Sequence, residues 1–296
     1  MDQAAGADSL ASDPTVESVR RVVFQGQPGA YSHLACRQAC PHFEALPAES
    51  FDDAFAAVRE GRAERAMIPI DNSIAGRVAD IHHLMPHCGL QIIGEHFQRV
   101  NHHLLAVPGA RLEQVQTVHS HVHALNQCRR LLHELGITPK IHADTAGAAA
   151  EVAEAGRVDQ AAIASRLAAE IHGLEILRAD IEDAEHNTTR FVVLAREARE
   201  PPPYEGPVIT SFLFRVRNVP AALYKALGGF ATNGVNMIKL ESYVDARFSQ
   251  AQFYAEVLGH PEQEALKHAF EELEFFSHEV ERLGVYPADP FRFQSV

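Results

Sequence analysis

The sequence predicts an α/β protein made of three parts: two lobes in which strands and helices alternate, and a smaller unit after them. Short apolar runs and helix-patterned segments alternate from residue 21 to residue 198, which is typical of mostly parallel sheets with helices on their faces. A proline-rich stretch at residues 200–206 interrupts this pattern and is typical of a stiff linker. Beyond it, six elements follow in the order βαββαβ over about 80 residues, which is the order of a ferredoxin-like unit.

Composition limits the classes of partner. The chain has 296 residues and is 46% hydrophobic and 22% charged, the balance of a soluble globular protein with about two domains. No apolar run approaches the roughly 20 residues of a membrane span. The formal net charge of −13 argues against nucleic acid or an anionic membrane as a partner. An anionic substrate would therefore have to be attracted by a locally built site.

The N-terminal segment and the cysteines indicate the compartment. Residues 1–20 are acidic and rich in Ala and Ser, without the basic start and apolar core of a signal peptide, so we expect a disordered segment. The four cysteines of this long chain indicate free thiols in a reducing compartment. We therefore expect a cytoplasmic protein.

The first lobe is predicted to hold residues 21–100 and to be completed by residues 181–198. Its strands are expected at residues 21–24, 66–70 and 90–96, and its helices at residues 30–40, 51–60 and 77–87. Ser50 is a candidate N-cap of the second helix. The pattern changes phase near residues 99–101, which predicts a crossover into the second lobe.

The second lobe is predicted at residues 101–180. Its strands are expected at residues 102–107, 115–119, 140–143, 161–164 and 175–178, and its helices at residues 120–135, 144–156 and 165–172. Asp144 is the candidate N-cap of the middle helix, and Gly156 ends it. Two lobes joined by two crossovers favour a cleft between them, where ligand pockets are common.

The third unit is predicted at residues 207–296, after a linker at residues 199–206. Its strands are expected at residues 208–216, 235–244, 250–258 and 278–283, and its helices at residues 221–232 and 261–274. A small sheet with one open face often pairs with a second copy. We therefore expect a homo-oligomer, either a dimer or a tetramer.

A polar run precedes the last apolar strand of the first lobe. Residues 185–191 lead into the apolar residues 192–195, and such a strand delivers its polar groups to the end of a sheet, where open α/β sheets bind ligands. Arg190 offers a rigid fork of donors suited to a carboxylate. Thr189 and Asn187 lie two residues apart and so face the same way in an extended chain. A polar turn whose arginine caps a nearby carbonyl is the alternative interpretation.

Three further polar clusters lie at the ends of predicted strands or helices. They contain Gly29, Tyr31 and Ser32; Asn72 and Ser73; and the segment from Ser120 to Gln127. The four clusters are rich in hydroxyl, amide and guanidinium groups and poor in carboxylates. Such a site binds an anion and donates hydrogen bonds to a departing oxygen, but it is unsuited to abstracting a proton. The glycines before the first helix would let the backbone approach a ligand, although a simple tight turn fits them equally well.

The 18 histidines raise the question of a metal site. His119, His121 and His123 alternate, but no carboxylate and cysteine shell accompanies them at ligand spacing. We therefore expect no metal. Ser73 and Ser120 lack a Gly-x-Ser-x-Gly elbow, which disfavours nucleophilic catalysis.

Taken together, these motifs make the chain resemble prephenate dehydratase joined to a C-terminal ACT domain. Residues 26–32 are similar to the family's Gly-x-x-Gly-Thr-Tyr-Ser loop, with Ala30 in place of threonine. Residues 69–76 are similar to Pro-x-Glu-Asn-Ser-x-x-Gly, with Asp71 in place of glutamate. Residues 120–128 and 187–191 are similar to Ser-His-Pro-Gln-Ala-Leu-x-Gln-Cys and Asn-x-Thr-Arg-Phe, and residues 144–149 also fit the family. The resemblance runs from about residue 21 to the end of the chain.

The resemblance implies two lobes arranged as in periplasmic binding proteins. It also implies loss of CO2 and water from prephenate to give phenylpyruvate, in phenylalanine biosynthesis, without a cofactor. By resemblance, Thr189 lies nearest the departing ring hydroxyl, which it would stabilise as a hydrogen-bond donor rather than as a true acid. Arg190 would either clamp a carboxylate or brace its strand. The other residues implied are Asn72, Ser120 and Gln127, which would orient the substrate, and Gly29, Tyr31, Ser32, Ser73 and Asn187, which would bind it. The group that protonates the leaving hydroxyl is not identified.

Two alternatives stay open at this point. Arogenate carries an amine in place of the side-chain keto group and would need one extra acceptor, which the sequence does not locate. The other alternative is a non-catalytic amino-acid sensor, which would not need Thr189 beside a hydroxyl site.

The resemblance also implies an amino-acid effector, phenylalanine above all, at an ACT dimer interface. The family's Gly-Ala-Leu turn is replaced by Ala221, Ala222 and Leu223, and its Arg-Pro pair is replaced by Tyr243 and Val244. The remaining neighbours expected in this pocket are Asn236, Leu240, Glu241 and Ser242. We expect amino-acid binding that is retained but altered.

Overall fold

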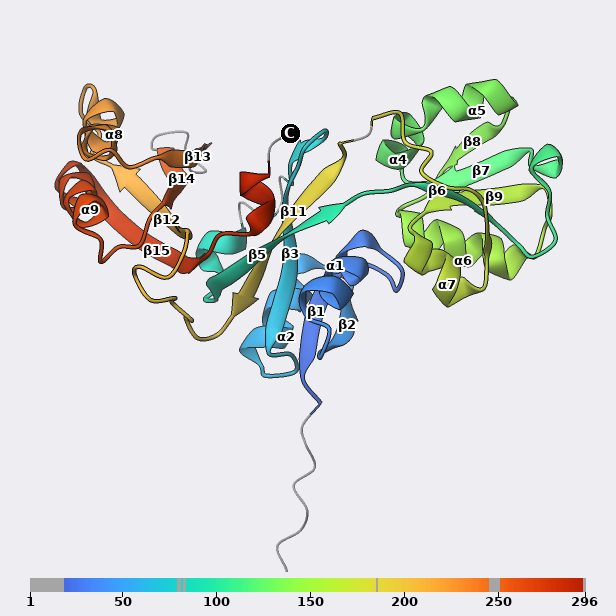
Figure 1. The fold of residues 1–296 in the computed structure, drawn as a ribbon, viewed down its shortest axis with the longest axis horizontal. Coiled ribbons are helices and arrows are strands. Elements are labelled where there is room, and N and C mark those ends of the chain that lie inside the picture. The colour runs from blue at the N-terminus through green and yellow to red at the C-terminus, as the bar shows by residue number, and fades with distance from the viewer. Residues whose placement is uncertain (1–18, 79–80, 82–83, 185, 245–250, 295–296) are drawn as a thin grey trace, which may run out of the picture.

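The computed structural model describes residues 19–78, 81, 84–184, 186–244 and 251–294. Its three sheets form three units in a row, with the first lobe in the middle (Figure 1). The segment expected to be disordered lies almost entirely outside the described residues. Part of the helix expected at residues 77–87 also lies outside them.

The sheet of the first lobe is mixed. Strand β1 (Arg21–Gln25) pairs in parallel with β2 (Glu44–Ala48) and β3 (Arg65–Asn72). Strand β11 (Thr188–Ala195) runs antiparallel to both β3 and β5 (Gln91–Arg99). Strand β5 therefore runs in the same direction as β1, β2 and β3, and β11 runs the opposite way between β3 and β5, because the chain returns from the second lobe in the opposite direction. The sequence analysis also missed β2, an edge strand that contains a proline, which edge strands tolerate.

Local signals place the helices and turns of this lobe. Helices α1 (Tyr31–Ala39) and α2 (Phe51–Arg59) form where they were expected. The Ser50 hydroxyl accepts a hydrogen bond from the Asp53 main-chain N–H at 3.1 Å and so caps α2. The short strand β4 (Gly76–Arg77) folds back on the end of β3, which fixes the polar turn between them. The 3-10 helix η1 (Met85–His87) precedes β5.

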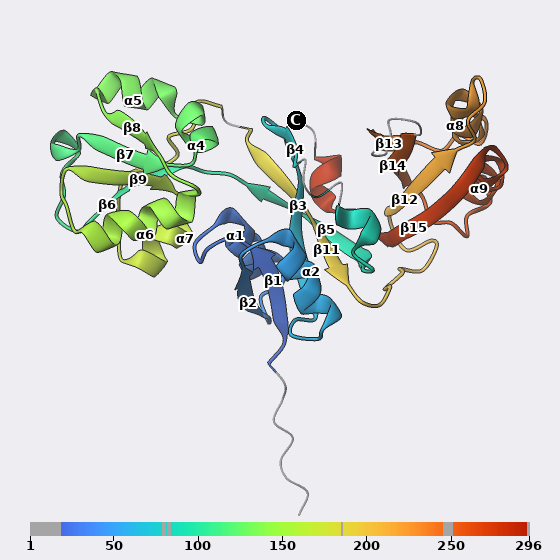
Figure 2. The same ribbon diagram turned by 180° about the vertical axis from the view of Figure 1, so that it is seen from behind.

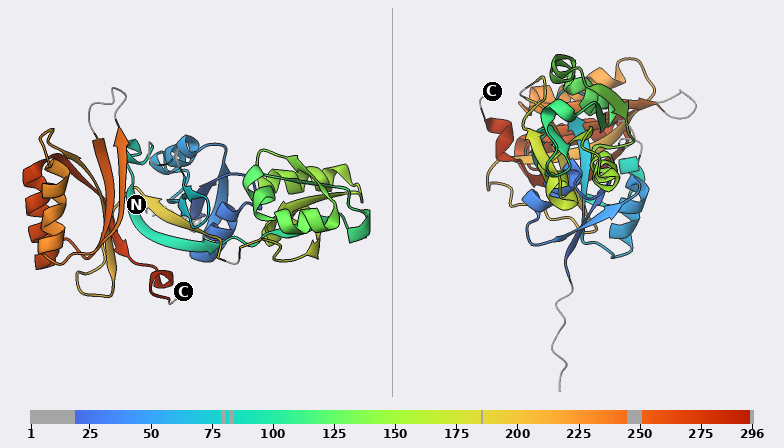
Figure 3. Two further views of the ribbon diagram at one scale, coloured as in Figure 1. Left: turned by 90° about the horizontal axis from the view of Figure 1, so that it is seen from above. Right: turned by 90° about the vertical axis from the view of Figure 1, so that its right-hand side faces the viewer.

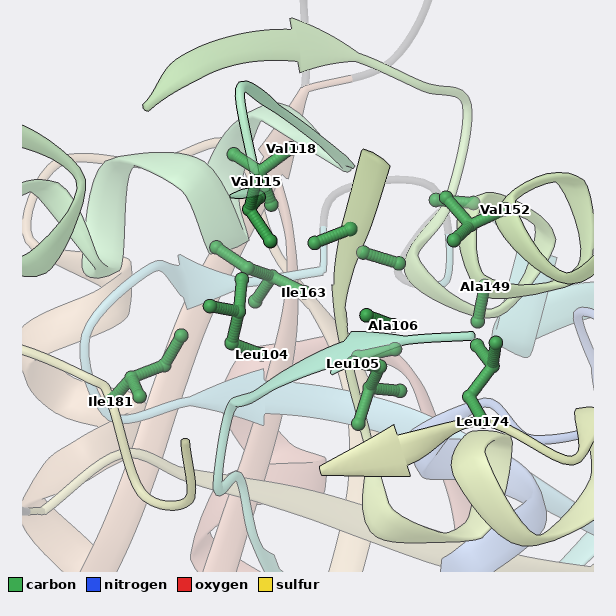
Figure 4. Close-up of a cluster of buried hydrophobic side chains, with 14 of the residues drawn as sticks. Leu104, Leu105, Ala106, Val115, Val118, Ala149, Val152, Ile163, Leu174 and Ile181 are labelled. Atoms are coloured by element: carbon green, nitrogen blue, oxygen red, sulfur yellow. The ribbon is translucent and has the colours of Figure 1, made fainter. Parts of the chain in front are cut away.

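The second lobe is built on one mixed sheet in the order β10-β6-β9-β7-β8. Its strands are β6 (His103–Ala106), β7 (Thr117–Ser120), β8 (Thr138–Ile141), β9 (Gln160–Ala164) and β10 (Glu175–Arg178). Leu104, Leu105 and Ile163 of the sheet belong to one apolar core with Val152 (Figure 4). Two segments join the lobes, one from β5 to β6 and one from β10 to β11 (Figure 2).

The helices of the second lobe differ from the prediction at one point. They are α4 (Val122–Gln127), α5 (Arg129–Leu135), α6 (Thr145–Ala155) and α7 (Arg166–His172), with the 3-10 helix η2 (Leu112–Gln114). The single helix expected at residues 120–135 is interrupted at Cys128, where ψ is 24°. Asp144 caps α6 by accepting the Gly147 N–H at 2.7 Å, and Gly156 ends this helix in the left-handed conformation, both as expected.

The C-terminal unit has the predicted βαββαβ order. Its elements are β12 (Val208–Val216), α8 (Ala222–Thr232), β13 (Met237–Val244), β14 (Ala251–Leu258), α9 (Glu264–Phe276) and β15 (Ser277–Pro287). The strands form an antiparallel sheet in the order β13-β14-β12-β15. Both helices lie on the face that points away from the first lobe (Figure 3). The 3-10 helix η3 (Pro290–Phe293) follows β15.

The other face of this sheet packs on the first lobe. Leu213 and Tyr286 belong to the same apolar core as Ile92 and Val192 of the lobe sheet. A Cβ atom at Gly284 would overlap the main-chain oxygen of Ile92, so only glycine permits this approach. The open sheet face from which we expected an oligomer is therefore covered by the first lobe, and the oligomeric state stays a prediction.

Candidate active site

Strand β11 presents Thr189 and Arg190 on opposite faces of its sheet, because successive side chains of a strand alternate. Thr189 is paired in register with Asn72 on β3 and with Gln98 on β5. Directly opposed residues share a face, so these three side chains form a row across the sheet. Arg190 belongs to the opposite row.

Main-chain groups fix the orientation of Asn72. Its Oδ1 accepts hydrogen bonds from the N–H groups of Ile74 at 3.0 Å and Ala75 at 2.8 Å, so its Nδ2 must point the other way. Nδ2 donates to Thr189 Oγ1 at 2.9 Å and to Asn187 Oδ1 at 2.8 Å. The turn after β3 thus sets the direction of every hydrogen bond that follows.

The same direction continues into the second lobe. Asn187 Nδ2 donates to Gln127 Oε1 at 2.9 Å, and His102 Nε2 lies 2.8 Å from the same oxygen. Because a carbonyl oxygen only accepts, His102 must carry a proton on Nε2. Burial lowers the pKa of His102, which favours the neutral ring. Its Nδ1 lies 2.9 Å from the Tyr31 hydroxyl, which also donates to Asn101 O at 2.7 Å.

These contacts define a junction network, whose members come from both lobes and from both crossovers. The members are Tyr31, Asn72, His102, Gln127, Asn187 and Thr189. Among the described residues, nothing accepts from the Gln127 Nε2 group or from the Thr189 hydroxyl. The network therefore ends in two unused donors and contains no carboxylate, so it suits an anion or an oxygen that gains negative charge.

Arg190 lies apart from this network. It is 6% exposed, and it donates to Glu95 Oε2 at 2.7 Å, to Glu256 Oε1 at 2.9 Å and to the Tyr286 hydroxyl at 3.1 Å. Although burial opposes its charge, Glu256 above all raises the pKa of Arg190. Of the two roles left open by the sequence, the structure favours the brace over the carboxylate clamp.

Arg190 belongs to a set of charges between the first lobe and the C-terminal unit, which we call the interdomain ion cluster. The cluster consists of Asp71, Glu95, Arg190, Lys239, Glu256 and Arg292. Arg292 donates to both oxygens of Glu95, at 2.7 and 2.8 Å, and Lys239 donates to Asp71 at 2.6 Å. Asp71 stands where the family has glutamate, and here it faces the C-terminal unit.

Two other predicted residues, Ser120 and Ser73, have structural partners, and a third, Ser32, is placed by its helix. The buried Ser120 hydroxyl donates to Ile163 O at 2.6 Å inside the second lobe, so the structure does not bring it to Thr189. Ser73 Oγ donates to His186 O at 2.7 Å and ties the turn after β3 to the returning crossover. Ser32 lies in the first turn of α1, next to Tyr31.

Gly29 approaches protein rather than an open ligand site. Its carbonyl accepts from the Ser165 hydroxyl at 2.6 Å. A Cβ at Gly29 would lie 2.8 Å from Ala168 Cα, and its φ is +96°, so the position requires glycine. Gly29 thus makes a close contact between the two lobes, and its expected contact with a ligand stays a prediction.

A cavity of about 650 Å³ lies between the lobes and shares one lining residue, Tyr31, with the junction network. Tyr31, Gln98, Arg99 and Arg166 are among the residues that line it. Neither of these two arginines forms an ion pair with a described residue, so both can receive an anionic ligand. Gln98 was not expected from the sequence; its side chain is buried and interacts with the His96 side chain on the same strand.

The predicted effector residues fall into two groups. Ala221, Ala222 and Leu223 line a cavity of about 310 Å³ at the start of α8. Ala221 has a φ of +61°, a conformation that favours glycine. The second group, Asn236, Leu240, Glu241 and Ser242, lies on or just before β13 and does not line this cavity. One chain thus does not bring the two groups together.

Two kinds of feature are absent from the described part of the chain. It contains no group of three or more His, Cys, Asp or Glu side chains placed to hold a metal ion. It also contains no helix that is both long and apolar enough to span a membrane.

The fold and the site define a two-lobed α/β protein with a ferredoxin-like C-terminal unit and a donor-rich junction between the lobes. A family model described as prephenate dehydratase matches residues 22–199, and the chain therefore belongs to the prephenate dehydratase family.

Three relatives illustrate the similarity. A bifunctional N-acyl-homoserine lactone acylase/prephenate dehydratase of Komagataeibacter europaeus is 56% identical over 275 residues, which cover 92% of this chain and 98% of that protein. Arogenate dehydratase/prephenate dehydratase 1, chloroplastic, of Arabidopsis thaliana is 38% identical, over 97% of this chain and 76% of that protein. The crystal structure of prephenate dehydratase in complex with L-Phe from Arthrobacter aurescens aligns with a TM-score of 0.83 at 28% identity, covering 93% of this chain and 92% of that one.

Proposed function

We propose that the chain converts prephenate to phenylpyruvate, CO2 and water. The observation that carries the proposal is that the junction network ends in two donors, the Thr189 hydroxyl and the Gln127 amide, without a carboxylate. In the reaction the ring carboxylate leaves as CO2, and its bonding electrons enter the ring. The ring then expels its hydroxyl, which takes up a proton to become water. Aromatisation supplies the driving force, so no cofactor is required.

In this proposal Thr189 stabilises the departing hydroxyl. Its oxygen already accepts from Asn72 Nδ2 at 2.9 Å, which leaves its own proton free to donate. A fixed donor of this kind acts in the transition state, where the leaving oxygen gains charge. A threonine hydroxyl is a poor acid at neutral pH, so the role is charge stabilisation rather than proton transfer.

The two substrate carboxylates need cations, and Arg190 is already paired. Arg99 and Arg166 line the cavity between the lobes and take this role in the proposal. The Gln127 amide then adds a directed, neutral donor. Replacing Arg166 with Gln should raise KM about tenfold with little change in kcat, because a ground-state contact is lost. An unchanged KM would remove Arg166 from substrate binding.

Arogenate is the second candidate substrate. The Arabidopsis relative carries both activities in its name, and Gln98 supplies a buried acceptor in the row of Thr189. The ammonium group of arogenate would donate a hydrogen bond to Gln98 Oε1, whereas the keto group of prephenate has no proton to donate. Rates with prephenate and arogenate, measured in parallel on the same preparation, decide the preference. Replacing Gln98 with Leu should lower the rate with arogenate more than the rate with prephenate.

The acylase activity in the name of the Komagataeibacter relative has no support in the described site. Ser73 and Ser120 both donate to main-chain carbonyls, so neither hydroxyl is paired with a base. We assign the dehydratase activity alone and include N-acyl-homoserine lactone as a side assay. If the chain hydrolysed that substrate, the nucleophile would have to be a residue other than Ser73 and Ser120.

Regulation by an amino acid is proposed at a site shared by two copies of the chain. The two groups of effector residues are separated within one chain, and a second copy would bring one group to the other. Calorimetric titration with phenylalanine and tyrosine, combined with initial rates, tests this site. Absence of binding by either amino acid would reject it.

The decisive assay is turnover of prephenate by the unmodified chain, followed by the appearance of phenylpyruvate. Exhaustive chelation should leave this rate unchanged. A chain that binds amino acids but turns over neither prephenate nor arogenate would be a sensor instead. Activity lost on chelation and restored by zinc would overturn the cofactor-free mechanism.

A further inference from the structure

His102 was not among the residues expected from the sequence, yet it lies at the centre of the junction network. It belongs to the crossover between β5 and β6 and is 2% exposed. Its ring contacts Tyr31 of the first lobe on one side and Gln127 of the second lobe on the other, at 2.9 and 2.8 Å. Its ring therefore links the lobes through two directed hydrogen bonds.

The position of the ring is fixed from the main chain. Glu182 Oε2 accepts the His102 N–H at 2.9 Å, and Glu182 Oε1 accepts from Asn101 Nδ2 at 3.1 Å. Glu182, on the crossover from β10 to β11, thus holds the crossover from β5 to β6 at His102. A ring held in this way cannot turn its nitrogens away from their partners without breaking these hydrogen bonds.

The position of the ring proton is fixed by chemistry. Gln127 Oε1 only accepts, so the nitrogen that faces it, Nε2, must carry the proton. In the neutral ring Nδ1 is then an acceptor, and it lies 2.9 Å from the Tyr31 hydroxyl, whose single proton is directed at Asn101 O at 2.7 Å. Burial raises the pKa of Tyr31 well above its usual value, so Tyr31 stays a donor.

The orientation of the Gln127 amide follows from these protons. Its oxygen accepts from both Asn187 Nδ2 and His102 Nε2. An amide turned by 180° would direct its NH2 group at two donors, so this rotation is disfavoured. The NH2 group is left facing away from both partners, without an acceptor among the described residues.

We propose that His102 is a positioning residue, whose Nε2–H holds the Gln127 amide so that its NH2 group is presented to the substrate. Tyr31 supports it by contact, because its hydroxyl lies against the other ring nitrogen, Nδ1. His102 itself does not touch the substrate. The proposal rests on the dehydratase function proposed above and assigns to the lobe crossover a role in that reaction.

A double-mutant cycle tests whether His102 acts through Gln127. In the full-length chain, His102→Leu should lower kcat/KM by about tenfold or more, less than the roughly hundredfold loss of a fixed donor. His102→Gln, whose amide reaches the place of Nε2, should restore most of the activity. In a Gln127→Met background, His102→Leu should cause no further loss, because the group that it positions is gone.

The neighbouring His103 provides the matched control. It is also buried and accepts the Asp180 N–H through Nδ1 at 3.2 Å, but it does not contact Gln127. His103 lines the cavity between the lobes, so His103→Leu is a control for additivity: any loss of kcat/KM that it causes should be the same in the wild-type and Gln127→Met backgrounds. A loss for His102→Leu that is equal in the wild-type and Gln127→Met backgrounds would show a structural role and overturn the proposal.

If His102→Leu does not fold, nitrogen NMR of the unmodified protein still tests the proposal, because it reports the tautomer of the His102 ring. The His102 ring signals, assigned by their absence in His102→Gln, should report the neutral tautomer with the proton on Nε2. A proton on Nδ1 alone would overturn the proposal. If the unmodified chain turns over neither substrate, the proposed function fails, while the tautomer still shows whether His102 holds Gln127.

Discussion

The two faces of β11 differ in kind, although Thr189 and Arg190 are consecutive residues. On the Thr189 face, the junction network is built from hydroxyls, amides and one imidazole, and no ion pair joins its described members. The Arg190 face is built from buried ion pairs, with Glu95 and Glu256 fully enclosed. The neutral face keeps two donors unused, whereas the charged face satisfies its groups internally.

This difference indicates which property each face determines. A buried ion pair gives little net stability, but breaking it leaves an uncompensated charge, which costs a great deal. A neutral donor costs little to keep and acts strongly on an oxygen that gains charge. We therefore expect substitutions on the Arg190 face to change stability and substitutions on the Thr189 face to change rate.

The largest effect is expected for Arg190→Met. It leaves Glu95 and Glu256 buried without their arginine, so the free energy of unfolding should fall by about 3–5 kcal/mol. Denaturant unfolding at neutral pH measures the change. Arg190→Lys keeps a positive charge but loses the fork of donors, so its free energy of unfolding should lie between those of the parent and Arg190→Met. A loss below about 1 kcal/mol for Arg190→Met would show that the cluster is not tightly coupled to the fold.

The next effect is expected for Thr189→Val, which removes the hydroxyl and keeps the shape. Its kcat should fall on the order of a hundredfold, while KM changes little, because the lost interaction forms mainly in the transition state. Its unfolding free energy should change far less than that of Arg190→Met. Steady-state kinetics at saturating prephenate measures kcat, and a near-normal value would remove Thr189 from the mechanism.

A smaller effect is expected on acidification. Burial opposes the charge of Glu95, but hydrogen bonding by Arg292 and the charge of Arg190 outweigh it and lower the pKa of Glu95 below its ordinary value of 4.5. A lowered folded-state pKa stabilises the fold fully above the unfolded-state value, and this stability is lost as pH falls through the folded-state value. Unfolding free energies measured between pH 7 and about pH 3 should therefore decline below about pH 4.5.

Thr189 provides the control for this titration, because its side chain does not ionise in this range. The difference in unfolding free energy between the parent and Thr189→Val should stay constant with pH. The difference between the parent and Arg190→Met should shrink as Glu95 is protonated. Equal slopes for the two variants would contradict the contrast between the faces.

The smallest effect is expected outside both faces, at Ala221. Its left-handed conformation, with φ of +61°, costs an alanine about 1 kcal/mol that glycine avoids. Ala221→Gly should therefore raise the free energy of unfolding by up to that amount, although the freer unfolded chain offsets part of it. Thermal unfolding of Ala221→Gly measures the change. Ala222→Gly is the comparison variant, because Ala222 belongs to helix α8 and its replacement by glycine should lower stability.

The sequence predicted the order of elements and most of the junction network, because both leave local signals. Asn72, Gln127, Asn187 and Thr189 each sit in a short polar motif at the end of an apolar run, and the structure brings all four together. Cap signals at Ser50 and Asp144 also placed two helices correctly. Catalytic and binding roles for these side chains stay predictions.

The remaining features depend on contacts between distant segments. Strand alternation puts Arg190 on the face opposite Thr189, but nothing near Arg190 in the sequence shows that Glu95 and Glu256 meet there. His102 and His103 form a doublet in which either residue fits the pattern, and only the crossover geometry selects His102. The antiparallel direction of β11 likewise depends on the path of the chain through the second lobe.

The contact at Gly284 has a consequence for how freely the C-terminal unit can be exchanged. Because β15 lies against Ile92 without an intervening side chain and shares an apolar core with the lobe sheet, this unit is not a detachable module. A chimera that joins the two lobes to a foreign C-terminal domain would have to reproduce the contact of β15 with Ile92 and the shared apolar core. The two parts of the chain are therefore constrained to evolve as one body, even though a proline-rich linker separates them in sequence.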